Sequence, residues 1–377
     1  MRAVVCLRPG ELAIEERPEP ERGEAEILVR VRRIGICGTD FHIYEGGHPY
    51  LQYPRIMGHE LSGEVLEAPL GSAFKRGQTV IINPYVSCGT CIACRNGKPN
   101  CCTRIAVLGV HRDGGMCERI SVPERNLYAA GNLTVDQAAS AEFLAIGAHA
   151  VARSRLKPGA RTLVIGAGPI GLGTALFAGL AGGAVTVMDR DADRLVFARD
   201  CGIAPRTIEA QNRPAEMLRN TTEGEGFDLV FDATGNRASM EAAFGHVAHG
   251  GTLVLVSVVT ENVTFSDPEF HKREMTLLGS RNALWSDFET VVTAIERVRV
   301  PLQRLLTHRT SLAGAVSELP RWTKEKKGLV SSAGAARRSW RTPANLPGST
   351  SYSAASACNS SRPLPPPGRY GPASSDM

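Results

Sequence analysis

The sequence predicts an α/β protein with two domains, one rich in short strands and one built on a doubly wound parallel sheet. Its 377 residues, of which 43% are hydrophobic, are enough for two cores. Short apolar or alternating runs, separated by proline, glycine and charged turns, fill the first third of the chain. From about Thr134 onward, strand and helix patterns alternate, which is the rhythm of βαβ units.

The first part of the chain contains five short segments with the pattern of strands. They are Ala3–Leu7, Ile27–Ile34, Gly63–Ala68, Thr79–Ile82 and Glu118–Val122. The segment Asp136–Leu156 follows, and its richness in alanine and leucine predicts a helix that links the two domains.

Strands and helices alternate in the second part, and the expected strands are Thr162–Ile165, Ala184–Met188, Leu229–Phe231, Thr252–Ser257 and Thr276–Gly279. The helices expected between them are Pro169–Leu180, Ala192–Asp200 and Ala238–Val247. A further helix, Ser286–Val298, is expected to return to the first domain. We therefore expect one domain of residues 1–145 and 286–330, a second of residues 146–285, and a tail of residues 331–377. The tail is rich in Ser, Pro, Ala and Arg without an apolar period, so we expect it to be disordered.

The net charge of +5 does not indicate a nucleic-acid partner. Five arginines and one aspartate give residues 331–377 a net charge of +4, which leaves +1 for residues 1–330. The first residues lack the apolar core of a secretory signal. The uncharged stretch Thr162–Met188 is broken by glycines and Pro169, which argues against a membrane span. We expect a cytoplasmic protein with neither a nucleic-acid nor a membrane partner.

Four clustered cysteines have the spacing of a structural zinc site. Cys88, Cys91, Cys94 and Cys102 form C-x2-C-x2-C-x7-C, and four thiolates at this spacing can surround one zinc ion tetrahedrally. No coordination position is then left for a substrate, so the ion would hold a loop of about residues 86–104 together. Cys101 could replace the fourth ligand, but the spacing favours Cys102.

A second, mixed set of possible ligands lies nearer the N-terminus. Cys37 precedes Gly38, and His59 and Glu60 follow Gly58 some twenty residues later. A thiolate, an imidazole and carboxylates suit a zinc site that keeps one position open for a substrate. On residue type alone this set is a weak signal, because a single cysteine or histidine usually belongs to packing.

Glycines 166, 168 and 171 form a G-x-G-x-x-G turn between the apolar strand TLVI and a predicted helix. The first glycine permits the tight turn, the second lets the backbone approach a pyrophosphate, and the third lets the helix pack on the strand. Pro169 and Ile170 complete the turn and begin the helix. Asp189, eighteen residues after Gly171, ends the next strand, where a carboxylate binds ribose hydroxyls and repels a 2′-phosphate. NAD is therefore favoured over NADP, although Arg190 follows directly.

The chain resembles the zinc-containing medium-chain alcohol dehydrogenases, in the branch of sorbitol, threonine and sugar-acid dehydrogenases. The resemblance covers residues 1 to about 330, and its motifs are GICGTDFHIY, YPRIMGHELSGEV, the four-cysteine loop and GAGPIG. The segments CCTRIAVLGVHRDGG, FSDPEFHKRE and LLGSRNA are similar to sugar-acid dehydrogenases of the L-galactonate 5-dehydrogenase type. The resemblance implies a GroES-like catalytic domain, a Rossmann cofactor domain, and a homodimer or homotetramer that pairs its cofactor domains edge to edge.

The resemblance also assigns roles to particular residues. It implies that Cys37 and His59 bind the catalytic zinc, with Glu60 and Glu142 alternating as direct or water-mediated ligands. Glu142 is followed by phenylalanine where many relatives have proline. Asp40 would accept the free N–H of His59 and orient the ring.

Two further residues of the first motif are expected to move the substrate's proton. Thr39 would contact the alcohol oxygen, and His42 would take the proton through the cofactor ribose and release it to solvent. A helix N-cap is the alternative for Thr39, and a solvated surface histidine is the alternative for His42. Arg194 matches an arginine that lies along the adenosine in relatives, with a solvated helix charge as its alternative.

Together these features predict a dehydrogenase that transfers hydride from a secondary alcohol, a polyol or an L-galactonate-like sugar acid, to NAD. Arg281 and Asn282 follow the last strand of the sheet, where an arginine could pair with a substrate carboxylate. The alternatives are a sorbitol- or threonine-type dehydrogenase and a catalytically silent protein that binds zinc and a dinucleotide. The silent reading is kept open by the C-terminus, where WTKEKKGLV turns into SSAGAARRSWRTP and the final strands of relatives are absent. We expect lower stability than complete relatives have.

Overall fold

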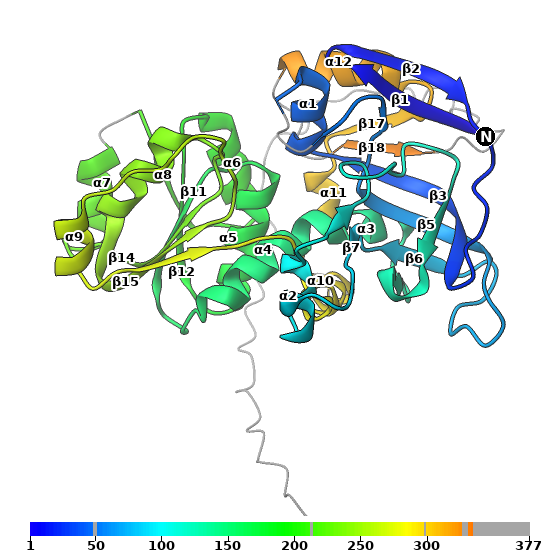
Figure 1. The fold of residues 1–377 in the computed structure, drawn as a ribbon. Helices are drawn as coiled ribbons and strands as arrows, with labels where there is room; N and C mark the ends of the chain where they lie inside the picture. The colour runs from blue at the N-terminus through cyan, green and yellow to red at the C-terminus, as the bar shows by residue number, and fades with distance from the viewer. Residues whose placement is uncertain (48–50, 212–213, 298, 326–330, 335–377) are drawn as a thin grey trace, which may run out of the picture. The chain divides into compact units, whose positions relative to one another are not determined.

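The computed structural model describes residues 1–47, 51–211, 214–297, 299–325 and 331–334 (Figure 1). The predicted α/β class is confirmed: a β-rich part and a six-stranded parallel sheet are both present. No helix in these ranges is both long and apolar enough to cross a membrane. The expected disorder of the tail concerns residues that, apart from 331–334, lie outside the described ranges.

The β-rich part contains two main sheets and a small hairpin. A three-stranded sheet has the order β2 (Glu11–Glu16), β1 (Arg2–Arg8) and β4 (Arg55–Ile56). The larger sheet has the order β10 (Leu127–Ala129), β6 (Thr79–Ile82), β5 (Glu60–Glu67), β3 (Glu26–Ile36), β18 (Ser331–Gly334) and β17 (His308–Ser311), with β9 (Arg119–Pro123) also paired to β3. The hairpin pairs β7 (Tyr85–Val86) with β8 (Ala106–Val107). The strands predicted here all form, with ends that differ by up to three residues.

The expected tail does contribute to the sheet, which corrects the prediction for its first four residues. Strand β18, Ser331–Gly334, lies between β3 and β17, antiparallel to one and parallel to the other. Sheet pairing uses backbone amides and carbonyls, so a segment of small residues can pair without the apolar pattern by which strands are recognised. The final pairing that seemed to be missing is therefore partly supplied by this short strand.

The second part is a parallel sheet with the order β13 (Arg206–Glu209), β12 (Ala184–Asp189), β11 (Arg161–Ile165), β14 (Phe227–Asp232), β15 (Val247–Leu255) and β16 (Thr276–Gly279). The intervening helices are α5 (Pro169–Leu180), α6 (Ala192–Asp200), α7 (Pro214–Thr221), α8 (Arg237–Ala243) and α9 (Asp267–Lys272). The chain starts in the middle, moves to one edge and then fills the other, so the order reverses between β11 and β14. That reversal creates the crevice where doubly wound sheets bind ligands.

A predicted strand and a predicted helix of this part differ clearly from the observed elements. The strand expected at Thr252–Ser257 is β15, which begins at Val247 and ends at Leu255. The helix expected at Ala238–Val247 ends at Ala243, and a 3-10 turn, Phe244–His246, leads directly into β15. The sequence analysis also missed β13, α7 and α9, because none of them has a long apolar run.

The helix expected at Asp136–Leu156 is two helices, α3 (Val135–Ala139) and α4 (Ala141–Ser154). Ser140 separates them, and its hydroxyl donates to the carbonyl oxygen of Asp136 at 2.9 Å. This short-range bond satisfies the end of α3 and lets α4 start in a new direction. As a result Glu142 lies in the first turn of α4, where it is buried.

The remaining helices belong to the β-rich part and to the return of the chain. They are α1 (Gly38–Glu45), α2 (Ile92–Arg95), the 3-10 turn Pro99–Cys101, α10 (Trp285–Glu296), α11 (Leu302–Leu305) and α12 (Ala315–Glu325). Helix α10 is the predicted returning helix, and it packs against α4. Val298, its expected last residue, lies outside the described ranges.

Candidate functional site

The four predicted zinc-binding cysteines come together in one loop. Cys91 Sγ lies 3.5 Å from Cys94 Sγ and 3.8 Å from Cys102 Sγ, and Cys88 belongs to the same cluster. With Zn–S bonds of about 2.3 Å, the sulfurs of a tetrahedral site are separated by roughly 3.8 Å, so this arrangement fits one zinc ion. Cys101 is exposed and outside the cluster, as the spacing indicated.

Hydrogen bonds favour the thiolate form of two of these cysteines. The Arg104 side chain and nearby backbone amides lower the pKa of Cys88 to about 5. Backbone amides of Cys94 and Thr103 lower the pKa of Cys91 to about 6. Because thiolates bind metal and thiols do not, these donors prepare Cys88 and Cys91 for zinc, whereas desolvation and the neighbouring thiols raise the pKa of Cys94 to about 11.

The second predicted metal site is also assembled, from three separate elements. Cys37 precedes the first residue of α1, His59 lies directly before β5, Glu60 begins β5, and Glu142 lies in the first turn of α4. Cys37 Sγ is 3.3 Å from Nε2 of His59. His59, Glu60 and Glu142 bring ligand atoms within 4.8 Å of one another. The four side chains therefore belong to two overlapping groups that share the buried His59.

Unpartnered polar atoms indicate what this cluster lacks. Both carboxylate oxygens of Glu60 are buried without a hydrogen-bond partner among the described residues. A buried carboxylate without a partner is costly, and a cation supplies what two hydrogen bonds would otherwise provide. The donor set of sulfur, imidazole nitrogen and carboxylate oxygen is one that zinc prefers. The residues present fit a zinc ion.

The electrostatics of the cluster agree with that fit. Burial raises the pKa values of Cys37, Asp40, Glu60 and Glu142 above their usual ranges. Burial lowers the pKa of His59, but the neighbouring carboxylates together raise it above its usual value. A cation in the cluster favours the charged forms of the thiol and the carboxyls.

Two residues that the sequence analysis missed shape this site. The Tyr85 hydroxyl donates to Oε1 of Glu142 and thereby holds one of the two carboxylates. Gly35 pairs with Glu60 across β3 and β5, and a Cβ atom at Gly35 would lie 2.0 Å from Oε2 of Glu60. Both contacts join residues distant in sequence, so no local spacing signal indicates them.

Three residues of α1 were assigned to proton transfer or ligand orientation. Asp40 is fully buried, and its Oδ2 accepts the Cys37 amide at 3.1 Å. Its Oδ1 is 3.8 Å from Nδ1 of His59, which is an ion-pair distance and longer than a hydrogen bond. Hydrogen bonds from Thr39 oppose the rise in the pKa of Cys37, so Thr39 lies at the metal cluster. His42 is exposed near the end of α1, one turn further along.

The glycine turn has the conformation that the motif requires. Gly166 has a φ of +100°, which favours glycine, and Gly168 is the residue before α5. A Cβ atom at Gly171 would lie 1.8 Å from the carbonyl oxygen of Gly166, so only glycine fits there. Pro169 and Ile170 open α5, whose first amides face the turn.

Asp189 and Arg194 lie beside this turn. Asp189 ends β12, and its carboxylate accepts the amides of Ala167 at 2.5 Å and Asp191 at 2.8 Å. Arg194 lies in α6, where its Nε is 3.6 Å from Oδ2 of Asp191. A Cβ atom at Gly168 would have Nη1 of Arg194 as its nearest neighbour, at 4.0 Å. Both predicted residues therefore lie where a dinucleotide would meet the sheet.

The predicted substrate residues follow β16 in a short segment that bends at Asn282. Arg281 is exposed, and its backbone oxygen accepts the Asn100 side-chain amide at 2.9 Å. The Asn282 side-chain amide donates to the backbone oxygen of Asn100 at 3.0 Å. The side-chain nitrogen of Asn282 is thus already hydrogen-bonded within the protein. Contact of Arg281 or Asn282 with a substrate stays a prediction.

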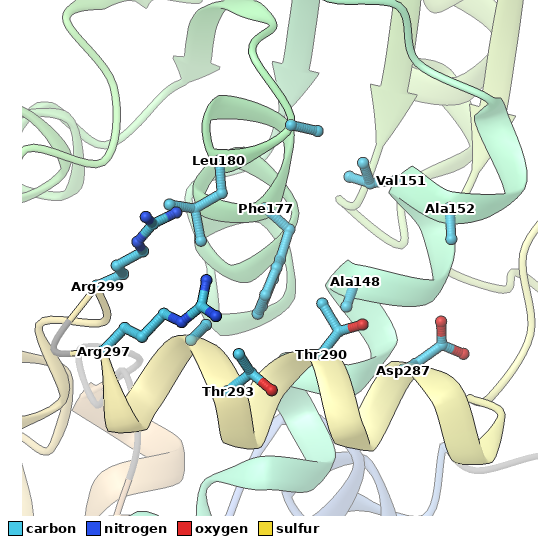
Figure 2. Close-up of a pocket in the computed structure, with 12 residues that line it drawn as sticks. Ala148, Val151, Ala152, Phe177, Leu180, Asp287, Thr290, Thr293, Arg297 and Arg299 are labelled. Carbon is cyan, nitrogen blue, oxygen red and sulfur yellow. The ribbon is translucent and has the colours of Figure 1, made fainter. Parts of the chain in front are cut away.

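A hollow of about 350 Å³ lies among helices α4, α5 and α10 (Figure 2). Apolar side chains such as Phe177 and Val151 line it, with Arg297 and Arg299 at one end and Asp287 at the other. None of its lining residues belongs to the metal clusters or to the glycine turn. The hollow is therefore separate from the candidate site.

Two family models match the chain. Residues 23–132 match the alcohol dehydrogenase GroES-like domain, and residues 169–297 match the zinc-binding dehydrogenase family. The first match contains the cysteine loop, Cys37, His59 and Glu60, and the second contains Asp189 and Arg194.

Curated relatives and solved structures agree with these models. The chain is 41% identical over 314 residues to L-galactonate-5-dehydrogenase of Escherichia coli K12, covering 83% of this chain and 92% of that protein. It is 33% identical to sorbitol dehydrogenase of Bacillus subtilis, covering 74% and 81%. An alcohol dehydrogenase from E. coli CFT073 complexed with NADH has a TM-score of 0.82 at 28% identity, covering 89% and 99%. A zinc-binding dehydrogenase from Sinorhizobium meliloti bound to NADP has a TM-score of 0.81 at 27% identity, covering 88% and 98%.

Proposed function

The chain belongs to the zinc-containing medium-chain alcohol dehydrogenases, which oxidise secondary alcohols with a nicotinamide cofactor, and we propose that its substrate is a sugar acid and its cofactor NAD. The observation that carries this proposal is that Cys37 on one side and Glu60 and Glu142 on the other all bring ligand atoms close to the buried His59. A silent dinucleotide-binding protein has no need to keep unpartnered carboxylate oxygens in its interior.

The chain's own residues divide the catalytic work. Cys37, His59 and one of the two glutamates hold the metal. Zinc bound there acts as a Lewis acid that polarises the alcohol oxygen. Glu60 is supported as the direct ligand because both of its oxygens lack a partner among the described residues, whereas Tyr85 already holds Glu142.

The substrate's proton leaves along α1 in this proposal. Thr39, which hydrogen-bonds Cys37, accepts the substrate's proton at Oγ1 while giving up its own hydroxyl proton. The exposed His42 then releases a proton to solvent. The three-residue spacing puts both side chains on one face of the helix. Asp40 keeps the His59 ring oriented from its buried position.

The cofactor binds across the glycine turn and the end of β12 in this proposal. The turn and the first amides of α5 receive the pyrophosphate, Asp189 accepts the ribose hydroxyls, and Arg194 lies along the adenosine. The Asp189 charge repels a 2′-phosphate, which supports NAD over NADP. The wild-type protein should therefore have a kcat/KM with NAD at least about tenfold above that with NADP, and Asp189→Ala should narrow the ratio.

A carboxylate on the substrate is supported by the position of Arg281. Arg281 follows the carboxyl end of β16, on the side of the parallel sheet where the carboxyl ends of all its strands lie. Burial, followed by the charges of Arg281 and Arg55, lowers the pKa of His111, so these cations lie near one another. The 41% identical relative is named for an acid substrate, L-galactonate.

The test compares aldonates with neutral polyols of the same chain length. Arg281→Ala should raise KM for aldonates by roughly tenfold to a hundredfold, the range expected for one charge-assisted hydrogen bond, and change polyol kinetics less than about twofold. Arg76→Ala, which removes an exposed arginine far from β16 in the sequence, is the control. Equal effects of Arg281→Ala on both substrate classes would refute a carboxylate contact.

Assembly and location complete the proposal. Strand β16 forms one edge of the parallel sheet and exposes 39% of Leu277, and such an edge is usually covered. Edge-to-edge pairing of two copies covers it, which supports a homodimer or a tetramer of two such pairs. A cytoplasmic location, expected from the sequence, belongs to the same proposal.

A further inference from the structure

Two reciprocal hydrogen bonds connect the four-cysteine loop to the turn after β16. Asn100, which lies between the cluster cysteines Cys94 and Cys102, donates from its side chain to the backbone oxygen of Arg281 at 2.9 Å. In return, Asn282 donates from its side chain to the backbone oxygen of Asn100 at 3.0 Å. Asn100 is only 4% exposed, so these bonds are protected from competing water.

The orientation of the Asn100 amide follows from its partners. A backbone oxygen only accepts, so the atom facing Arg281 must be the Asn100 nitrogen. The same nitrogen lies 3.2 Å from Nε2 of His149, which must therefore accept, and the ring proton lies on Nδ1. Nδ1 donates to Oδ2 of Asp287 at 2.8 Å, and that oxygen also accepts the Leu284 amide at 2.7 Å. Each of these donors has an acceptor, whereas Oδ1 of Asn100 is buried without a hydrogen-bond partner among the described residues.

The bonds link four segments that are distant in sequence. Asn100 belongs to the cysteine loop, His149 to α4, Asp287 to α10, and Arg281 to the turn after β16. Asp287 projects from α10 on the side that faces Ala148 of α4 (Figure 2). His149 and Asp287 are both buried, so Asn100 is held by a rigid support.

The turn itself needs such a support. Asn282 has a φ of +53°, in the left-handed region that asparagine tolerates better than most residues. Strand β16 ends at Gly279, and α10 begins only at Trp285. Between them, the backbone oxygen of Arg281 accepts a hydrogen bond from the Asn100 side chain. The Arg281 side chain is exposed.

We infer that Asn100 is a positioning residue for the substrate: by fixing the backbone of Arg281, it holds the guanidinium where the substrate carboxylate binds. The inference rests on the proposed function, because it takes Arg281 as the carboxylate's partner. It gives the cysteine loop a second role, since the zinc that orders the loop also orders Asn100. A side chain that is already held in place loses less entropy when it binds its ligand.

The test uses Asn100→Ala in the full-length protein, with Asn96→Ala as the matched control. Asn96 is exposed in the same loop. Zinc content, amide exchange of residues 279–284, and KM and kcat with an aldonate and a neutral polyol are measured. Asn100→Ala should keep two zinc ions per chain, speed exchange in the turn, and raise KM for the aldonate about tenfold, the upper range for one hydrogen bond. Polyol kinetics should change less than about twofold.

Other outcomes overturn the inference in distinguishable ways. Unchanged exchange in the turn, or an equal rise in KM for both substrates, means that Asn100 does not position Arg281. If Asn100→Ala loses zinc, the milder Asn100→Ser is measured in its place. A rise in KM for the aldonate alone then supports the inference, and an equal change for both substrates overturns it. Arg281→Ala separates the two claims. If Arg281→Ala raises KM for the aldonate but not for the polyol, and the Asn100 variants show no such difference, only the inference about Asn100 is wrong. If Arg281→Ala fails to discriminate, the carboxylate contact is wrong and the inference falls with it.

Discussion

Glu60 can be buried at the metal cluster because Gly35, its partner on the neighbouring strand, has no side chain. A Cβ atom at Gly35 would lie 2.0 Å from Oε2 and 2.7 Å from Cβ of Glu60. Both atoms belong to a side chain that is 1% exposed, so neither can move into solvent. The position of one metal-facing carboxylate is therefore set by a residue that touches no substrate.

Gly35→Ala should displace Glu60 and weaken the catalytic zinc. Overpacking of this kind costs about 1–3 kcal/mol, and the clash falls on a ligand. We expect about one zinc ion per chain, a lower melting temperature, and turnover reduced at least about tenfold. Gly38→Ala is the control, since an added Cβ there meets no atom within 4 Å. Unaltered zinc content in Gly35→Ala would exclude Glu60 as a ligand.

His111 reports on the cationic group near the proposed substrate site. Burial, then the charges of Arg281 and Arg55, hold its pKa below the usual value of 6.5. The unfolded chain therefore binds this proton more readily than the folded one, and the contribution of His111 to stability is lost as pH falls below about 6.5. In Arg281→Ala the pKa of His111 should rise, as measured by NMR titration, and in Arg76→Ala it should not. An unchanged pKa in Arg281→Ala would place Arg281 away from His111.

Whether a site residue could be predicted from the sequence depended on how many residues separate it from its partners. The four-cysteine cluster was predicted from spacing, since all of its members lie within fifteen residues. Glu142 is far from Cys37 in sequence, and only the family resemblance pointed to it. Tyr85 and Asn100 act through contacts made by the folded chain, so no local pattern indicates their roles.

The cysteine loop is the element whose order depends most on metal. Its only regular structure is the short helix α2 and one 3-10 turn, so the loop has little core of its own. Cys94→Ser should remove one zinc ion per chain and lower the melting temperature. Cys101→Ser, an exposed neighbour outside the cluster, should do neither. If both variants kept two zinc ions, the assignment of the four ligands would be wrong.

Strand β18 leads to a prediction about the end of the chain. It lies between β3 and β17, so a chain ending at Val330 loses pairing on both sides. We expect this truncation to melt at a clearly lower temperature than the full-length protein, and a truncation after Gly334 to melt within about two degrees of it. Equal melting temperatures for the two truncations would mean that β18 contributes no stability.

At the level of elements, the segments whose ends carry a clear residue signal were predicted best. Helices α5 and α6 and strand β16 have the predicted bounds, because Pro169 opens α5, Asp191 precedes α6 and Gly279 ends β16. The long helix before them was predicted without its break, since the bond between Ser140 and Asp136 leaves no mark in the apolar pattern. Strand β18 was missed because its pairing depends on backbone atoms alone.

For the whole molecule, the parts combine into one oxidoreductase. The parallel sheet and its glycine turn place a cofactor at the point where the strand order reverses. The β-rich part supplies Cys37, His59 and Glu60, and α4 adds Glu142. The cysteine loop connects to the turn after β16 through Asn100. The family is established, and the sugar-acid substrate and the preference for NAD are what remain to be tested.

The measurement that tests this account most directly is zinc content per chain together with NAD reduction on a panel of aldonates, polyols and threonine. The account predicts two zinc ions per chain and the highest kcat/KM with an aldonate. Two zinc ions without turnover of any panel member, or turnover by a protein that holds a single zinc ion, would contradict it.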